Sequence, residues 1–231
     1  MAHHYVPQVY LRYFSPDQKN IFRYDKNSDE EKLLPIKRIG AINDYYTYLN
    51  RLGQKDTSLE SPFFSNFEGI YPELITALER NDPLESHRDY MICLIAIMHA
   101  RVPKQRSHLS GVLQRFHEQA PSLGVYSKNV DLEAMMELVK VYAGTMAQSY
   151  FWVGVIQDDS TFITSDNPAG NPFLPLTPKI ALFTSQEKGG LEYRGVDQEI
   201  VQKINQLTFM NAEKYIFTHK AEHIMPYVKK I

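Results

Sequence analysis

The sequence has a single cysteine, a single tryptophan and no long apolar run. Cys93 has no second cysteine with which to form an internal disulfide or a zinc site, so a reducing cytoplasm is the compartment we expect. No apolar stretch approaches the roughly 20 residues needed to cross a bilayer, and the first residues lack the basic and apolar regions of a secretory signal. We therefore expect a soluble, cytoplasmic protein without a membrane partner.

An excess of charge of either sign is also missing. The 25 Lys and Arg residues nearly balance the 27 Asp and Glu residues, which gives a formal net charge of −2 and a pI near 6.4. This balance removes the overall basic field of a general nucleic-acid binder, although a local basic patch stays open. Aromatic residues are abundant instead, with 15 Tyr and 12 Phe. Many of the tyrosine hydroxyls must therefore reach a surface or a hydrogen-bond partner.

The signatures of several enzyme classes are absent as well. The chain has no Walker phosphate loop, no Gly-x-Gly-x-x-Gly, no His-Glu-x-x-His and no Gly-x-Ser-x-Gly elbow. Its paired histidines resemble the opening of His-Asn-His nucleases, but no histidine occurs between Tyr5 and Ser86 to supply a second ligand nearby. We therefore reject that assignment.

Hydrophobic spacing predicts helices and strands in a mixed order. Helices are expected at residues 6–14, 61–80 with a bend at Pro72, 90–108 with a restart at Pro103, 109–119, 131–146 and 197–210. Strands are expected at residues 20–25, 33–39, 44–49, 150–156, 161–164, 179–184 and 214–218, with loops at 50–58 and 120–129 and a tight turn at Asp158-Asp159 that joins 150–156 to 161–164. This order predicts one α+β domain, residues 1–231, in which a helical cluster packs against a mainly antiparallel sheet.

The first polar group of interest is the segment His3-His4-Tyr5-Val6-Pro7-Gln8. Pro7 suits the first turn of a helix, which places two imidazoles and a carboxamide at a helix start. Adjacent residues of an extended segment point to opposite faces, so we expect either His3 or His4 to point inwards. Imidazole titrates near neutral pH, ligates metals and transfers protons. The alternative is a disordered N-terminus.

A second group follows the most apolar helix. Arg101 and Gln105 lie one helical turn apart and continue its apolar face, and Arg106 lies on the neighbouring face. A guanidinium that emerges from a buried stripe must be paired with a carboxylate or hold an anion. The alternative to anion binding is an internal ion pair with a carboxylate such as Glu68.

The third group is acidic. Asp166 and Asn167 precede a proline and end a strand abruptly, at a place where sites are often assembled. The alternative is an ordinary Asp-Asn-Pro turn in which the Asp side chain caps backbone groups, and the sequence alone favours this simpler interpretation. Glu60 and Glu68 could supply a general base or a ligand for a hard metal, or could be merely solvated charge.

Several segments together resemble one widespread bacterial and phage family. They are the opening His-His-Tyr-Val-Pro-Gln-Val-Tyr-Leu-Arg-Tyr-Phe of residues 3–14 and the residues 59–68, 101–106, 163–168, 175–178 and 205–217. The family is a domain of unknown function, number four-two-three-eight, and offers no reaction to carry over. The resemblance implies that His4, Gln8, Glu68, Arg101 and Asp166 belong to one site. Val9 stands where an aromatic residue is expected, which leaves the polar positions unchanged.

The leading hypothesis is a metal-dependent, nuclease-like enzyme that acts on a phosphodiester or nucleotide, with Mg²⁺ or Mn²⁺ as the candidate cofactor and a nucleotide or nucleic acid as the partner. Its catalytic residues would be His4, Glu68 and Asp166, and its substrate-binding residues His3, Gln8, Arg101, Gln105, Arg106 and Asn167. A second hypothesis is a module that senses an anion or nucleotide, or binds a partner, without catalysis. In a third, the same groups form a buried structural network. Metal binding and oligomeric state stay open.

Overall fold

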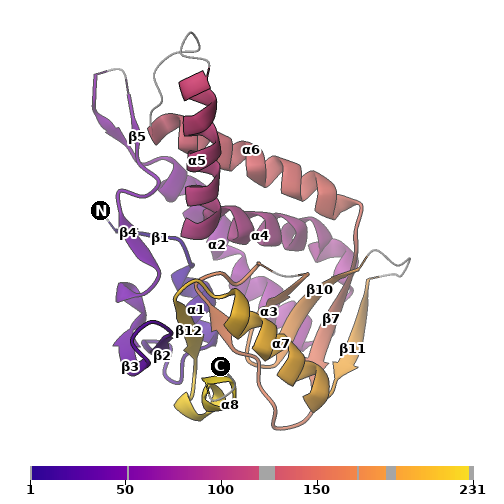
Figure 1. Cartoon of the computed structure of the whole chain (residues 1–231). Coiled ribbons are helices and arrows are strands. Elements are labelled where there is room, and N and C mark those ends of the chain that lie inside the picture. Colours follow the sequence, from indigo (N-terminus) through magenta and orange to yellow (C-terminus); the bar gives the residue numbers. More distant parts are fainter. Residues whose placement is uncertain (1, 51, 120–127, 171, 186–190, 229–231) are drawn as a thin grey trace.

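The computed structural model describes residues 2–50, 52–119, 128–170, 172–185 and 191–228 (Figure 1). Two four-stranded sheets pack with a group of helices, which confirms the predicted α+β class. One hydrophobic core includes buried side chains from Tyr5 to Phe217 and so joins both ends of the sequence. Most of the predicted loop at 120–129 lies outside the described residues.

The first sheet combines strands from the two ends of the chain. Its order is β3 (Glu30–Pro35), β2 (Asn20–Asp25), β12 (Tyr215–Thr218) and β8 (Thr164–Ser165), and every neighbouring pair is antiparallel. The edge strand β3 begins with the exposed charges Glu-Glu-Lys, a composition that discourages pairing with another chain. β2 therefore lies inside the sheet, next to a strand almost 200 residues later in the sequence.

The second sheet is built from the later part of the chain. Its order is β11 (Glu192–Val196), β7 (Tyr150–Ile156), β10 (Ile180–Ser185) and β9 (Phe173–Pro175), and only the β11–β7 pair is parallel. Trp152 stacks on Phe183 of the neighbouring strand with 3.8 Å between ring centroids.

The predicted hairpin between residues 150–156 and 161–164 is wrong. β7 pairs with β10 and β11, whereas β8 pairs with β12 in the other sheet. A residue outside the turn stabilises it: the Lys179 ammonium donates to the carbonyls of Asp158 and Ser160 at 2.6 and 2.8 Å. The turn therefore carries the chain from one sheet to the other.

The helices agree with prediction best where a proline or a capping residue defines a boundary. α4 (Arg88–Arg101) ends at Val102, whose ψ of 145° is extended, and Pro103 begins α5 (Pro103–Gln119) as predicted. Asp197 caps α7 (Gln198–Asn211) by accepting the Ile200 N–H at 2.9 Å.

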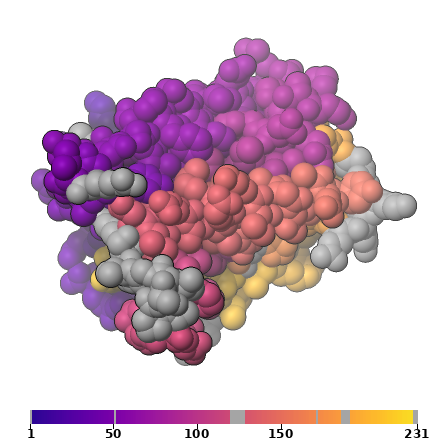
Figure 2. All heavy atoms as spheres, turned by 90° about the horizontal axis from the view of Figure 1, so that it is seen from above, coloured from indigo at the N-terminus to yellow at the C-terminus, as the bar shows by residue number. Residues whose placement is uncertain are grey.

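α6 (Lys128–Ala147) begins three residues before its predicted start. It packs beside α4, whose sequence has no polar face through its middle, and covers that helix on one side. Seen from above, α6 is the salmon band that runs across the molecule next to the purple N-terminal half (Figure 2).

The predicted single helix of residues 61–80 is wrong. Three shorter pieces replace it, η2 (Leu59–Phe64), α2 (Ser65–Gly69) and α3 (Tyr71–Glu79). Ser61 interrupts the first piece with extended angles of φ −138° and ψ 120°. Pro72 lies in the first turn of α3, where its missing N–H costs no helical hydrogen bond, rather than at a bend within one helix.

The predicted strand at 44–49 is also largely wrong. Asp44 has a positive φ of 53° and its carbonyl accepts the Thr47 N–H in a turn, so only β5 (Tyr48–Leu49) is extended. β5 pairs with β6 (Lys55–Asp56), inside the predicted loop of 50–58, and β3 ends at Pro35 rather than at residue 39.

The remaining elements are short: β1 (Ala2–His4), α1 (Gln8–Tyr13), η1 (Ile36–Arg38), β4 (Ala41–Asn43), η3 (Leu84–His87), η5 (Ala221–His223) and α8 (Met225–Val228). Among the described helices, none is both long and apolar enough to cross a membrane.

Candidate functional site

The N-terminal segment is anchored along its length. β1 pairs with β4, the Tyr5 N–H donates to the Gly40 carbonyl at 2.7 Å, and α1 follows immediately after Pro7. Gly40 has a φ of 62° and a Cβ there would lie 3.1 Å from the Val6 Cβ, so this close approach requires glycine. The polar residues of the segment therefore lie on an ordered part of the chain.

The two histidines diverge, as expected of neighbours in an extended segment. His3 is fully buried; its Nδ1 accepts the Tyr46 backbone N–H at 2.8 Å, and its ring stacks on the Tyr46 ring at 5.8 Å. His4 is half-buried and lies at the surface end of a polar group. His3 thus serves the interior, while His4 is open to a ligand.

His4 makes a side-chain contact through each ring nitrogen. Nε2 lies 3.4 Å from the Lys37 carbonyl, and Nδ1 lies 3.4 Å from the Gln8 Nε2. The tautomer with a proton on Nε2 satisfies both contacts, because it donates to the carbonyl and accepts from the carboxamide. Burial lowers the pKa of His4, an effect that the Lys37 carbonyl and Glu68 oppose and Arg101 reinforces. The ring is therefore neutral at neutral pH.

Arg101 is the buried centre of this group, with none of its surface exposed. Its guanidinium donates to Glu68 Oε1 at 2.7 Å, to the Tyr46 hydroxyl at 3.0 Å and to the His4 carbonyl. Its Cζ also lies 4.2 Å from the centroid of the Phe64 ring. Burial lowers the pKa of Arg101, but Tyr46 and Glu68 outweigh it and the net pKa is raised. The internal ion pair that sequence left as an alternative is thus present.

Two carboxylates complete the group from the η2–α2 segment. The Glu68 side chain is 23% exposed beyond its ion pair with Arg101. Burial raises the pKa of Glu60; Arg101 lowers it, Glu68 raises it further, and the His4 backbone N–H lowers it. Glu60 Oε2 is buried without a hydrogen-bond partner in the described part of the chain. A buried carboxyl oxygen of this kind is suited to hold a proton.

The space beside Arg101 is small. A cavity of about 10 Å³ lies there between α1, α3 and α4, lined by Glu68, Tyr10 and Tyr71 among others. That volume accommodates roughly one water molecule. In this conformation the space beside the Arg101 guanidinium is therefore too small for a phosphate-sized ligand.

Arg106 and Gln105 lie on α5, beyond the break at Pro103. Arg106 is buried, donates to the Tyr45 carbonyl, and places its Cζ 4.3 Å from the centroid of the Tyr45 ring. Gln105 is partly exposed. Arg106 therefore holds the aromatic turn that leads to Tyr46, and does not join the His4 group directly.

Asp166 and Asn167 serve another segment. The Asp166 carboxylate accepts the backbone N–H groups of Glu213, Lys214 and Tyr215 at 2.9, 2.8 and 2.9 Å, and only 5% of the residue is exposed. Burial raises the pKa of Asp166, these three hydrogen bonds lower it, and the net pKa is raised. Asn167 donates from Nδ2 to the Asn211 carbonyl at 3.1 Å. Both side chains thus fix the approach to β12: the Asp166 carboxylate does cap backbone N–H groups, but those of a segment 47 to 49 residues later rather than those of its own turn.

The structure therefore brings together His4, Gln8, Glu68 and Arg101. Asp166 shares no hydrogen bond or ion pair with these four among the described residues, although sequence placed all five in one site. Glu60 and Tyr46 are additional members. Glu60 was a candidate base or metal ligand on sequence, whereas nothing in the sequence distinguishes Tyr46 from the other tyrosines.

The donor set offers limited support for a tightly held metal. Among the residues with described positions, no three His, Cys, Asp or Glu side chains gather in a way that would hold a metal ion. Mg²⁺ commonly binds through one or two carboxylates together with substrate phosphates, and Glu68 could serve in that way.

Comparison with known proteins adds a family and no activity. Searches of curated proteins and of solved structures found no match. A family described as "Protein of unknown function (DUF4238)" matches residues 2–222, nearly the whole chain. The chain therefore belongs to the DUF4238 family.

Proposed function

We propose that this protein is an enzyme that acts on a phosphodiester or nucleotide, with His4 and the carboxylates Glu60 and Glu68 as its proton-transferring groups. The observation that carries the proposal is the neutral, half-buried His4 ring beside a buried Arg101–Glu68 ion pair and a second carboxyl with a raised pKa. In sites for general acid–base catalysis, the surroundings often lower the pKa of the base, as for His4, and raise the pKa of the acid, as for Glu60.

His4 is the proposed base. Its Nδ1 lone pair accepts a hydrogen bond from the Gln8 carboxamide, which is exposed enough to move aside for a substrate hydroxyl or a water. A neutral imidazole takes the proton from that nucleophile as the bond to phosphorus forms. The Lys37 carbonyl holds Nε2–H throughout and stabilises the imidazolium that results.

Glu60 is the proposed acid. Its raised pKa keeps a proton on the carboxyl to higher pH than usual, so it can donate to the leaving oxygen as the phosphorus–oxygen bond breaks. Glu68 is held in place by its ion pair with Arg101. It is the candidate ligand for a Mg²⁺ or Mn²⁺ ion that would enter with the substrate. Lys37 and Arg38 are exposed on the turn that holds His4 and supply positive charge for a phosphate.

The experiment is a cleavage assay on purified protein. RNA, single- and double-stranded DNA and nucleotides are incubated with EDTA, Mg²⁺ or Mn²⁺, and products are separated by chromatography. Turnover that His4→Gln and Glu60→Gln reduce at least about 100-fold supports the proposal. His108→Gln is the matched control, since His108 is an exposed histidine on α5 outside the site. Turnover that persists in His4→Gln, or no turnover with any substrate, overturns it.

A second candidate is an anion- or nucleotide-binding module without catalysis. The observation that favours it is that the internal partners of Arg101 leave its guanidinium no role in a reaction, while the exposed Lys37 and Arg38 beside His4 offer positive charge for an anion. Thermal-shift titration separates the two, because a ligand that binds the folded state raises the melting temperature without forming product.

A further inference from the structure

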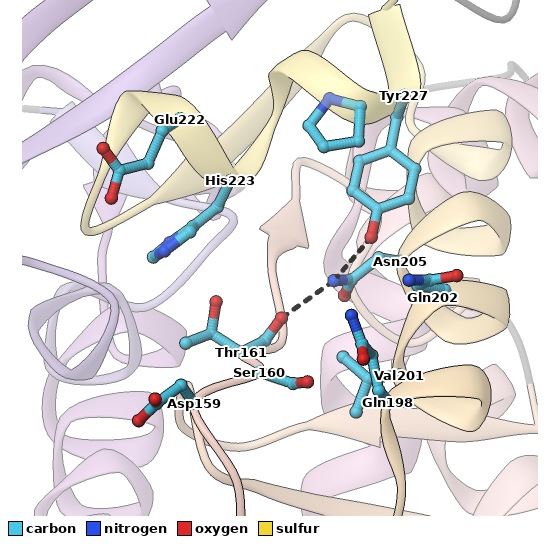
Figure 3. A pocket seen from close by; sticks show the side chains of 11 residues that line it. Asp159, Ser160, Thr161, Gln198, Val201, Gln202, Asn205, Glu222, His223 and Tyr227 are labelled. Atoms are coloured by element: carbon cyan, nitrogen blue, oxygen red, sulfur yellow. Dashed lines mark hydrogen bonds between the residues drawn. The ribbon is translucent and has the colours of Figure 1, made fainter.

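A second cavity lies at the other end of the chain. It has a volume of about 270 Å³ and opens between the turn before β8, the first half of α7 and the segment that carries η5 and α8 (Figure 3). None of its lining residues belongs to the His4 group. It is lined by Asp159, Ser160, Thr161, Gln198, Gln202, His223 and neighbouring side chains.

The inner wall of the cavity is rigid. Asn205 is buried and donates from Nδ2 to the Thr161 carbonyl at 2.8 Å and to the Tyr227 hydroxyl at 3.1 Å, while its Oδ1 accepts the Ile163 N–H at 3.0 Å. One carboxamide thus ties together three segments that surround the cavity (Figure 3). A wall fixed by complete hydrogen bonding is pre-organised for a ligand and costs little to order on binding.

Uncommitted polar groups face this wall. Gln198 and Gln202 are four residues apart on α7 and so share one face of the helix, where Figure 3 shows them beside the cavity. Neither carboxamide has a hydrogen-bond partner in the described part of the chain, and each offers two donors and one acceptor. His223 projects from the opposite side, with Nδ1 3.5 Å from the Thr218 hydroxyl.

The charges beside the cavity are balanced and offer no basic site for an anionic ligand. Among the described lining residues there is no lysine or arginine, whereas Asp159 and Glu222 are exposed carboxylates at the cavity. Lys179, on the adjoining turn, donates to the Asp158 and Ser160 carbonyls instead. Glu222 is paired with Lys220 at 3.8 Å, so a free phosphate would meet no lysine or arginine in the lining that lacks a partner of its own.

We propose that this cavity binds an uncharged, hydroxyl-rich ring, through the carboxamides of Gln198 and Gln202 and the imidazole of His223. A hydroxyl both donates and accepts, which matches carboxamides, a neutral imidazole and carboxylates together. The volume is slightly below that of pockets for drug-sized ligands and fits a single ring with its substituents. A free sugar and the ribose of a nucleoside share this chemistry. The inference is independent of the activity proposed for the His4 group.

The test is a ligand titration of the full chain followed by NMR. Hexoses, pentoses and uncharged nucleosides form separate arms, and inorganic phosphate forms a fourth. One of the first three arms is expected to bind with a dissociation constant on the order of 1 mM, as expected for a small polar ligand, and to shift the His223 ring signals. The arm that binds identifies the source of the ring.

Two variants localise the binding. Removing both carboxamides with Gln198→Ala and Gln202→Ala is expected to weaken binding about tenfold or more, since each lost hydrogen bond costs several-fold. Both side chains are exposed, so the fold is expected to persist. Gln206→Ala is the matched control, one turn further along α7 and outside the cavity lining, and should bind as the unaltered protein does. Absence of binding in all three ring arms, preference for phosphate, or equal affinity in the double variant overturns the proposal.

Discussion

The guanidinium of Arg101, at the last turn of α4, donates a hydrogen bond to the backbone carbonyl of His4, 97 residues earlier in the sequence. The same guanidinium binds Glu68 and Tyr46, so one buried cation joins four separate segments. The position of the candidate base is thereby set by the most buried helix of the fold. The proposed chemistry at His4 therefore depends on the hydrogen bond from Arg101, which also stabilises the fold.

The Arg101–Glu68 pair should behave as a coupled unit. Glu68→Leu leaves a buried charge without its carboxylate and should lower the free energy of unfolding by about 3 kcal/mol, near the lower bound for a broken buried pair because Glu68 is partly exposed. In the double variant with Arg101→Met, the loss should be smaller than the sum of the two single losses by roughly 1–3 kcal/mol. Urea denaturation of all four proteins measures this coupling.

An exposed pair supplies the comparison. Lys203 Nζ and Glu199 Oε1 are 2.7 Å apart on side chains that are 70% and 77% exposed, so Lys203→Ala should leave the unfolding free energy nearly unchanged. Strictly additive losses at Arg101 and Glu68 would contradict a structural ion pair.

Asp166 should affect stability rather than catalysis. Asp166→Asn replaces one acceptor oxygen by a donor that faces backbone N–H groups, and should cost about 1–3 kcal/mol in unfolding free energy. If the proposed enzyme is active, its kcat at a temperature where the variant is folded should be nearly unchanged. A variant of normal stability with abolished turnover would instead return Asp166 to the site.

The proposed activity should depend on pH through His4 and Glu60. Burial holds the pKa of His4 below its ordinary value of 6.5, so kcat/KM should stay high as the pH falls to 6.5 and decline only at lower pH. Glu60→Gln should remove the decline on the alkaline side, where the acid loses its proton. An acidic midpoint above 6.5, measured under kcat/KM conditions, would be inconsistent with His4 as base.

Acid sensitivity of the fold should come partly from His219. Burial, followed by the neighbouring His223, lowers the pKa of His219 from 6.5 to about 4, and its Nδ1 is buried without a partner in the described chain. Between pH 6.5 and 4 the unfolded chain therefore binds a proton that the folded chain does not. The free energy of unfolding consequently decreases as the pH is lowered from 6.5 to 4. Because the ring is only half-buried, solvent screening limits the loss to roughly 1–2 kcal/mol.

Chemical denaturation at pH 7 and at pH 4.5 measures this loss. His219→Asn should show a smaller decrease between the two pH values than the unaltered protein, whereas the control His108→Asn should show the same decrease. Equal pH dependence in the His219 variant would rule out this group as a source of acid sensitivity.

The parts of the fold that sequence predicted are those fixed by local chemistry. Pro103 cannot continue the preceding helix, and Asp197 caps the next backbone N–H groups whatever surrounds it. The elements that sequence misassigned depend on distant partners. β8 is a strand because β12 pairs with it, and no spacing within residues 161–164 contains that information.

In the candidate site, too, features set by local sequence could be predicted and features set by distant partners could not. Residue type and helix position predicted that Arg101 is either paired with a carboxylate, for which Glu68 was a candidate, or holds an anion. The hydrogen bonds from residues 213–215 to the Asp166 carboxylate could not be predicted, because these partners lie 47 to 49 residues later in the sequence. Sequence named Glu60 as a possible base or metal ligand, and the structure adds that its Oε2 is buried without a hydrogen-bond partner among the described residues.

The pairing of β2 with β12 also determines when the site can form. β2 occupies the inside of its sheet only after residues 215–218 exist, and Tyr10 reaches its partners, Thr164 and the Pro175 carbonyl, only after β8 and β9 are made. On the ribosome, the histidine segment is made before these strands and must therefore wait for them. A truncated product that lacks β12 would leave one edge of β2 without its hydrogen-bonded partner and present an unfinished His4 group.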